Sequence, residues 1–162
     1  MSLSEVAVKR VRSSTKISFS NEDMTWVHHP HNDALVVILQ IGEFDVKMIL
    51  IDLGSSIEIL YYELFKKLGL SHEALLNVEY PLYGFNSSPV FSLGCIFLSV
   101  KAGETVHQVK FQVVNVPSPY NAIMGRTWLH QMEAVPSTFH QVLRFPKANI
   151  VKTIRGDQIM AK

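Results

Sequence analysis

A run of apolar residues that ends abruptly in an acidic residue is the strongest constraint in this sequence. Residues 48–56 read Met-Ile-Leu-Ile-Asp-Leu-Gly-Ser-Ser, so a core-seeking segment delivers Asp52 directly into a turn. A carboxylate at the end of a buried strand is costly unless it has a partner or a function. An aspartate that opens a glycine turn is also an ordinary structural feature, and Asp-x-Gly alone does not separate the two interpretations.

The composition indicates one folded domain without a strongly charged partner. Apolar residues make up 48% and charged residues 18% of the 162 residues, which is enough apolar material for a core. The net charge of +1 favours neither nucleic acid nor a membrane as a partner. No apolar stretch approaches the roughly 18 residues of a membrane helix, and the basic N-terminal region does not resemble a signal peptide.

Cys95 is the only cysteine, so no internal disulfide can form. It lies in an apolar run and is expected to be a small buried hydrophobe rather than a nucleophile. A single reduced cysteine fits a reducing, cytoplasmic location.

Three segments are expected along the chain: a flexible lead-in at residues 1–16, a folded domain at 17–146 and a linker at 147–162. The lead-in is rich in serine and basic residues and has no sustained period. Its basic cluster is short and lacks interleaved aromatic residues, which favours a solvated tail over a nucleic-acid site. The linker is expected because its apolar content is weak.

Short apolar segments separated by turn residues predict a β-rich domain. Strands are expected at residues 34–41, 44–52, 93–100, 106–116, 122–124 and 142–145, with a short edge strand at 17–20 and a hairpin over 78–90. The second strand is expected to place Phe44, Val46, Met48 and Leu50 on one face. This spacing of turns predicts a small antiparallel barrel or sandwich.

Two short helices are expected between the strands. The first covers residues 61–68 and ends at Gly69, and a further helical turn follows Ser71. The second covers residues 126–132.

His28, His29 and His31 lie close together around Pro30, which raises the question of a metal site. Pro30 breaks any helix that could align these side chains, and no carboxylate or cysteine stands at a typical ligand spacing. No metal is therefore expected.

A second glycine element lies far from Asp52 in the sequence. Ile123, Met124 and Gly125 form an apolar pair and a glycine that precede the second helix. A glycine in this context lets one strand pass close beneath another loop. The hairpin between the two elements is a candidate lid, with its tip near Asn86, Ser87 and Ser88. The residues expected to cover a substrate are Tyr83, Gly84 and Phe85, just before the tip, together with Asn86 and Ser87.

Taken together, these segments resemble the retropepsin-like aspartic proteases, and within them those of plant gypsy-type long-terminal-repeat retrotransposons. The resemblance covers nearly the whole chain from Ile17 onward. It is carried by residues 17–20, 30–37, 50–56, 64–65, 68–70, 118–126, 145–146 and 154–158. The last group resembles the connector that precedes reverse transcriptase in such polyproteins.

The resemblance implies an all-β fold, a small closed antiparallel barrel with one or two short helices, and a homodimer without a cofactor. Each chain would supply one catalytic aspartate, Asp52, for water-mediated hydrolysis of an extended peptide or polyprotein under the flap hairpin. Gly54 would let the loop backbone approach the carboxylate, and Ser55 would hydrogen-bond its outer oxygen. Arg126 would form a structural ion pair, for which Glu58 is the proposed partner.

Leu53 departs from the family pattern, which has threonine after the aspartate. The threonine hydroxyl ties the two active-site loops together across the dimer, and leucine cannot make that bond. Two hypotheses therefore stand: an active aspartic endopeptidase that processes a retrotransposon polyprotein, and a decayed or domesticated module that dimerises or binds extended peptides without cutting them.

Overall fold

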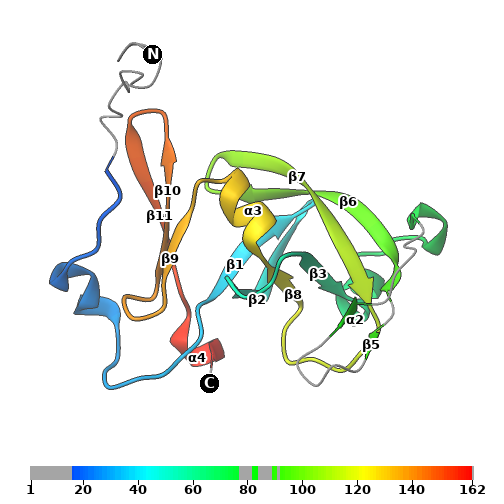
Figure 1. Cartoon of the computed structure of the whole chain (residues 1–162), viewed down its shortest axis with the longest axis horizontal. Coiled ribbons are helices and arrows are strands. Elements are labelled where there is room, and N and C mark those ends of the chain that lie inside the picture. The colour runs from blue at the N-terminus through cyan, green and yellow to red at the C-terminus, as the bar shows by residue number, and fades with distance from the viewer. Residues whose placement is uncertain (1–15, 77–81, 84–88, 91, 162) are drawn as a thin grey trace, which may run out of the picture.

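The computed structural model describes residues 16–76, 82–83, 89–90 and 92–161. Six strands close into a barrel in the order β1-β2-β8-β3-β7-β6 (Figure 1). Their bounds are β1 Val36–Ile41, β2 Phe44–Ile51, β3 Glu58–Tyr61, β6 Ser92–Ala102, β7 Thr105–Val114 and β8 Ala122–Met124. The predicted small closed barrel is confirmed.

The barrel is not purely antiparallel. Strand β2 pairs in parallel with β8, and β3 pairs in parallel with β7. Parallel neighbours require crossover connections, and both pairs join strands that are distant in the sequence. Strand β8 consequently lies between β2 and β3, which brings the residues after β8 to the end of β2.

Smaller elements complete the described structure. A three-stranded sheet has the order β11-β10-β9, with β9 at Val135–Ser137, β10 at Val142–Lys147 and β11 at Ile150–Arg155. The helices are α2 Tyr62–Lys67, α3 Arg126–Gln131 and α4 Gln158–Ala161, and the 3-10 helices are η1 Asn21–Trp26 and η2 His72–Ala74. Gly69 has a φ of 71° after α2, and the Ser71 hydroxyl accepts the Glu73 N–H in η2, so both predicted caps are confirmed.

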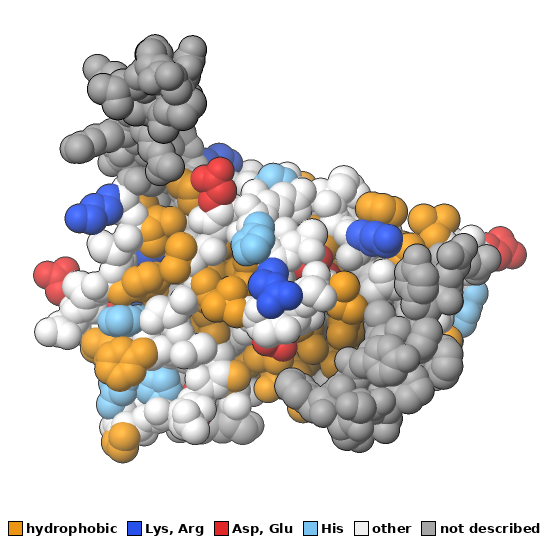
Figure 2. Space-filling model, in the orientation of Figure 1, with side chains coloured by type: hydrophobic (Ala, Val, Ile, Leu, Met, Phe, Trp, Pro, Cys, Tyr) orange, Lys and Arg blue, Asp and Glu red, His pale blue; other side chains and the backbone are white. Residues whose placement is uncertain are grey.

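One hydrophobic core joins the barrel to the three-stranded sheet. Phe111 and Leu60 are buried inside the barrel, Trp128 is buried on α3, and Phe145 is buried on β10, all in the same cluster. Cys95 is buried on β6, as predicted. On the face shown in Figure 2, apolar side chains gather below α3, in the region where Figure 1 places β2 and β8.

Strand β2 does not keep the alternation that its sequence suggested. Val46 is buried, but the next buried residues are Ile49 and Ile51, while Met48 and Leu50 are only half-buried. Met48 has a φ of 58°, and β2 has one residue more than β1 at this point, which is a β-bulge. The predicted common face of Phe44, Val46, Met48 and Leu50 is therefore wrong, because the bulge reverses the phase of the strand. Leu50 is turned towards the surface on which Asp52 lies.

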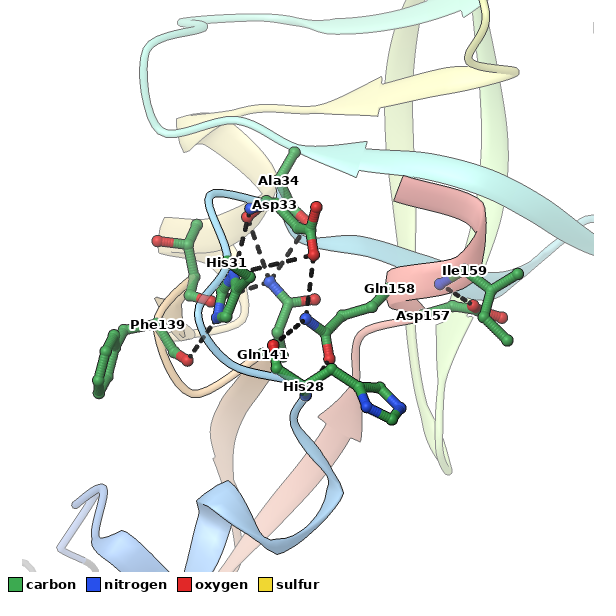
Figure 3. Close-up of polar contacts among 10 residues, drawn as sticks. His28, His31, Asp33, Ala34, Phe139, Gln141, Asp157, Gln158 and Ile159 are labelled. Atoms are coloured by element: carbon green, nitrogen blue, oxygen red, sulfur yellow. Dashed lines mark hydrogen bonds and ion pairs between the residues drawn. The ribbon is translucent and has the colours of Figure 1, made fainter. Parts of the chain in front are cut away.

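The residues expected as a linker contain regular structure. Strand β11 pairs with β10 at six positions, and Gln158 is buried at the start of α4. The Gln158 side chain accepts the His28 N–H at 2.9 Å and donates to the His28 carbonyl and to the Asp33 carboxylate (Figure 3). Hydrogen bonds of this kind hold a polar segment in place that apolar content alone does not predict.

The segment before β1 packs on the three-stranded sheet without forming a strand. Residues 17–20 have no regular structure, so the predicted edge strand is wrong. Arg144 on β10 donates to the Ser18 carbonyl at 2.7 Å and forms an ion pair with the buried Asp23. The hydrogen-bonded Arg144 guanidinium holds the pKa of the Asp23 carboxyl well below its usual range.

We expect Asp23→Asn to lower the free energy of unfolding by about 1–3 kcal/mol at neutral pH, because it leaves Arg144 without its charged partner. A carboxyl whose folded-state pKa is depressed contributes stability above its unfolded pKa and loses it as the pH falls. The difference between variant and parent should therefore narrow below about pH 4. Urea unfolding across this range measures it. Glu22→Gln, at an exposed position, is the matched control. If Asp23→Asn and the parent differ by the same free energy of unfolding at all pH values, the lowered pKa of Asp23 is contradicted.

Candidate active site

Asp52 stands at the end of β2 in a tight turn with a half-exposed side chain. Its N–H donates to the Met124 carbonyl at 3.0 Å, which ties the turn to β8. The Gly54 N–H donates to Oδ1 of Asp52 at 2.8 Å. A Cβ on Gly54 would lie 3.1 Å from that oxygen, so the predicted close approach of backbone and carboxylate is observed.

Ser55 does not bind the Asp52 carboxylate. Its hydroxyl donates to the Ile57 carbonyl at 2.6 Å and accepts the Ile57 N–H at 3.3 Å. Since a hydroxyl has a single hydrogen to donate, the expected bond to the outer oxygen of Asp52 is wrong. Within the described part of the chain, Oδ2 of Asp52 has no hydrogen-bond donor.

The turn between β2 and β3, residues 52–57, is called the Asp52 loop below. Gly125 passes directly beneath this loop. Strand β8 pairs with β2 through Met124 and with β3 through Ile123, so the residue after β8 emerges between the two strands. A Cβ on Gly125 would lie 2.6 Å from the Ser55 carbonyl oxygen and 2.5 Å from that of Ile57. No side chain fits at this distance, and the predicted close passage is confirmed.

The first residues of α3 bind the carbonyl groups of the Asp52 loop. The Arg126 N–H donates to the Ser55 carbonyl at 2.8 Å, and its guanidinium donates to the Leu53 carbonyl at 3.3 Å. The Thr127 hydroxyl donates to the Ser56 carbonyl at 3.0 Å. The expected ion pair between Arg126 and Glu58 is wrong, because the guanidinium is directed to the loop instead.

Glu58 has a different role, which the sequence did not reveal. It begins β3 and is only 3% exposed. Its Oε2 atom accepts the Gly125 N–H at 3.1 Å and the Trp128 N–H at 3.2 Å. Burial raises the pKa of the Glu58 carboxyl, and hydrogen bonds from the backbone N–H groups of Trp128, Gly125 and Glu58 itself partly oppose that change.

A groove of about 460 Å³ lies beside Asp52. Most of its lining is apolar or aromatic, and includes Leu50, Tyr61, Pro117, Pro119, Tyr120 and Ile123. Sequence reasoning did not identify Tyr61 or Tyr120, since only the crossing of β8 between β2 and β3 brings their segments to Asp52. Such a groove suits an apolar side chain of an extended peptide.

The base of the predicted flap hairpin is present. Strand β4, Leu82–Tyr83, pairs antiparallel with β5, Pro89–Val90. The predicted flap residues Gly84, Phe85, Asn86 and Ser87 lie outside the described residues, so their place over Asp52 stays a prediction.

The histidine segment packs against the loop between β9 and β10. His31 lies within hydrogen-bond distance of the Phe139 carbonyl, at 3.1 Å, and accepts the Asp33 N–H (Figure 3). Among the described residues, no cluster of three or more histidine, cysteine or acidic side chains could bind a metal. In the same part of the chain, no helix is long and apolar enough to cross a membrane.

We expect Gly125→Ala to lower the free energy of unfolding by about 1–3 kcal/mol, because the added methyl group overlaps two carbonyl oxygens. Gly69→Asn is the matched control, since nothing lies near that position and asparagine tolerates its positive φ. Urea unfolding of both variants measures the difference. Equal stability of Gly125→Ala and the parent would show that the close passage is not constraining.

We also expect the stability of the parent to decline relative to Glu58→Gln as the pH rises above the ordinary carboxyl range. A carboxyl whose folded-state pKa is raised holds its proton more tightly in the folded protein, so ionisation at higher pH opposes folding. Urea midpoints from about pH 4 to about pH 8 measure the trend. The urea midpoint of Glu63→Gln, at an exposed position, should change with pH as the parent's does. If the midpoint of Glu58→Gln also follows the parent at every pH, the raised pKa of Glu58 is contradicted.

Comparison with known proteins identifies the fold. No protein-family model and no curated protein matches the chain. Solved structures do match it. The retroviral protease-like domain of Ddi1 from Leishmania major superimposes with a TM-score of 0.61 at 16% identity, over 78% of this chain and 96% of that one.

Two further structures agree with this result. The EIAV protease in complex with the inhibitor HBY-793 gives a TM-score of 0.55 at 16% identity, over 68% of this chain and 99% of that one. A retropepsin-like aspartic protease from Rickettsia conorii gives a TM-score of 0.51 at 16% identity, over 75% and 81% of the two chains. The chain therefore has the retropepsin-like fold.

Proposed function

We propose that this chain is one half of an aspartic endopeptidase, in which two copies place their Asp52 carboxylates side by side. The observation that carries the proposal is the geometry of Asp52 itself. Its carboxylate is half-exposed, is held by the Gly54 N–H, and borders an apolar groove within a retropepsin-like fold. Asp52 is the only acidic residue that lines this groove within the described part of the chain, which supports a second copy as the source of the second carboxylate.

The proposed mechanism uses the paired carboxylates as acid and base. Two carboxylates in contact cannot both ionise, so they share one proton, and the apparent pKa values belong to the pair. The ionised Asp52 takes a proton from a water molecule, whose oxygen attacks the scissile carbonyl carbon. The protonated Asp52 donates to the carbonyl oxygen. Collapse of the tetrahedral intermediate breaks the C–N bond and returns a proton to the leaving amine.

The proposed substrate is an extended peptide. The apolar lining beside Asp52, with Tyr61 and Tyr120, supports binding of apolar side chains. The hairpin that starts at β4 and β5 would close over the bound chain and exclude water. From the resemblance to plant gypsy-type elements we infer that the natural substrates are junctions of a retrotransposon polyprotein, cut in a reducing, cytoplasmic compartment without a cofactor.

Leu53 supports a second candidate, a non-catalytic module that dimerises or binds extended peptides. Its side chain is 52% exposed beside Asp52, which leaves it available to pack against the same residue of a second copy. Such a contact would hold a dimer together, but it lacks the directional hydrogen bond of a hydroxyl. The pair of carboxylates would then be less well placed for catalysis.

We expect the chain to cleave members of a peptide library at about pH 5, where a carboxylate pair shares one proton. Asp52→Asn should lower the rate at least about a thousandfold. Leu53→Thr should raise the rate, because it supplies the missing hydroxyl. Mass spectrometry of the products gives both the rates and the sequence preference.

Asp45→Asn is the matched control, because Asp45 is exposed on the same strand, near its opposite end. Cleavage that survives Asp52→Asn would refute the proposed mechanism. If neither the parent nor Leu53→Thr cuts any peptide while sedimentation shows a folded dimer, the non-catalytic module replaces the endopeptidase as the function of this chain.

A further inference from the structure

Glu58 is the buried acidic residue nearest to the Asp52 loop, and the proposed mechanism does not use it. We propose that Glu58 is a positioning residue, which holds the start of α3 beneath the loop and thereby fixes the Asp52 carboxylate. The catalytic readout of this inference rests on the proposed function, whereas its structural readouts do not.

Helix α3 cannot cap its own N-terminus. Its N-cap residue is Gly125, which has no side chain, and no acidic residue occurs in its first turn. The first N–H groups of a helix have no partner within the helix and need acceptors from elsewhere. Glu58 supplies one from β3, since a single carboxylate oxygen accepts the N–H groups of Gly125 and Trp128 at 3.1 and 3.2 Å.

The capped end of α3 is the part that binds the Asp52 loop. Arg126 and Thr127 together bind three carbonyl groups of the loop, those of Leu53, Ser55 and Ser56. Gly125 itself is in contact with two loop carbonyls. A shift of this helix end therefore moves the backbone on both sides of Gly54, the residue whose N–H holds Asp52.

The requirement at position 58 is an acceptor rather than a charge. Glu58 forms no ion pair within the described residues, and its Oε2 atom accepts the backbone N–H groups of Gly125 and Trp128. An amide oxygen accepts the same bonds. A leucine fills a similar volume but leaves both N–H groups buried without a partner. A comparison of Glu58→Gln with Glu58→Leu therefore distinguishes the role of the hydrogen-bond acceptor from the role of side-chain volume.

The experiment compares these two variants in the full chain carrying Trp26→Phe. The sequence has two tryptophans, of which Trp26 is exposed and Trp128 is fully buried, so this background leaves Trp128 as the reporter of α3. Three readouts are made: amide hydrogen exchange at Gly54 and Gly125, emission of Trp128, and kcat and KM on a peptide that the parent cleaves.

We expect Glu58→Gln to stay within about threefold of the parent in kcat and to keep the protection of the Gly54 amide. Glu58→Leu should lower kcat by about tenfold to about a hundredfold, since small displacements of reacting groups have effects of this size. Its KM should change by less than about twofold, because Glu58 does not line the groove. Exchange at Gly54 should accelerate, and Trp128 emission should shift to longer wavelength.

Val100→Ala is the control for a merely structural effect. Val100 is buried in the barrel core and pairs with Ile41, at the end of the β1–β2 hairpin opposite Asp52. This variant should lower global stability and leave Gly54 exchange and kcat near the parent values under native conditions. The proposal is overturned if Val100→Ala and Glu58→Leu behave alike, or if Glu58→Leu keeps both Gly54 protection and kcat.

The inference stays testable if Glu58→Leu does not fold and also if the parent cleaves no peptide. If Glu58→Leu does not fold, Glu58→Asp takes its place, because a carboxylate one methylene shorter cannot reach both N–H groups. Faster Gly54 exchange in Glu58→Asp then supports the proposal, and unchanged exchange overturns it. If the parent cleaves no peptide, the proposed function fails, while hydrogen exchange and Trp128 emission still decide whether Glu58 holds the loop.

Discussion

The close passage of Gly125 beneath the Asp52 loop is the contact on which the rest of the site depends. Two stretches of backbone meet there with no room for a side chain, because a Cβ would approach two carbonyl oxygens within 2.6 Å. This proximity lets the first residues of α3 donate to the loop carbonyls, and lets β8 pair with both β2 and β3. The Asp52 carboxylate is thus placed by contacts within one chain, in which main-chain groups of the loop meet both main-chain and side-chain groups of α3.

The barrel and the three-stranded sheet act as one support for this crossing. Trp128 on α3 and Phe145 on β10 are buried in the same cluster as the barrel residues, so the helix that braces the loop is itself packed from behind. The Asp23–Arg144 ion pair joins the segment before β1 to this sheet, and the Gln158 side chain joins the residues after β11 to that same segment, at His28 and Asp33. Apolar burial defines the support, and hydrogen bonds attach the chain ends to it.

Elements that are marked by their own residues could be predicted from the local sequence pattern. Strand β8 at Ala122–Met124 and helix α2 with Gly69 were predicted from apolar spacing and a terminal glycine, and both are present. The phase of β2 could not be predicted, because the positive φ falls on Met48 rather than on a glycine. Strand β11 was missed although four of its six residues are β-branched, because the weak apolar content of the whole segment 147–162 favoured a linker and the pairing with β10 has no mark in the sequence. The Glu58 cap was missed for a related reason, since its partners are backbone N–H groups that no sequence pattern marks.

The sequence by itself determined that an apolar strand ends in Asp52, that glycines follow the carboxylate and precede α3, and that the chain forms a small β-rich domain. These properties are local, because they depend on side-chain type and on the conformational freedom of single residues. Only the tertiary structure decided that β8 lies between β2 and β3, that Arg126 binds the loop rather than Glu58, and that Glu58 caps α3. The contacts of Arg126 and Glu58 each join a side chain to a backbone group about 70 residues away. Backbone groups are chemically alike at every position, so which of them a side chain meets is selected by the packing of the whole fold.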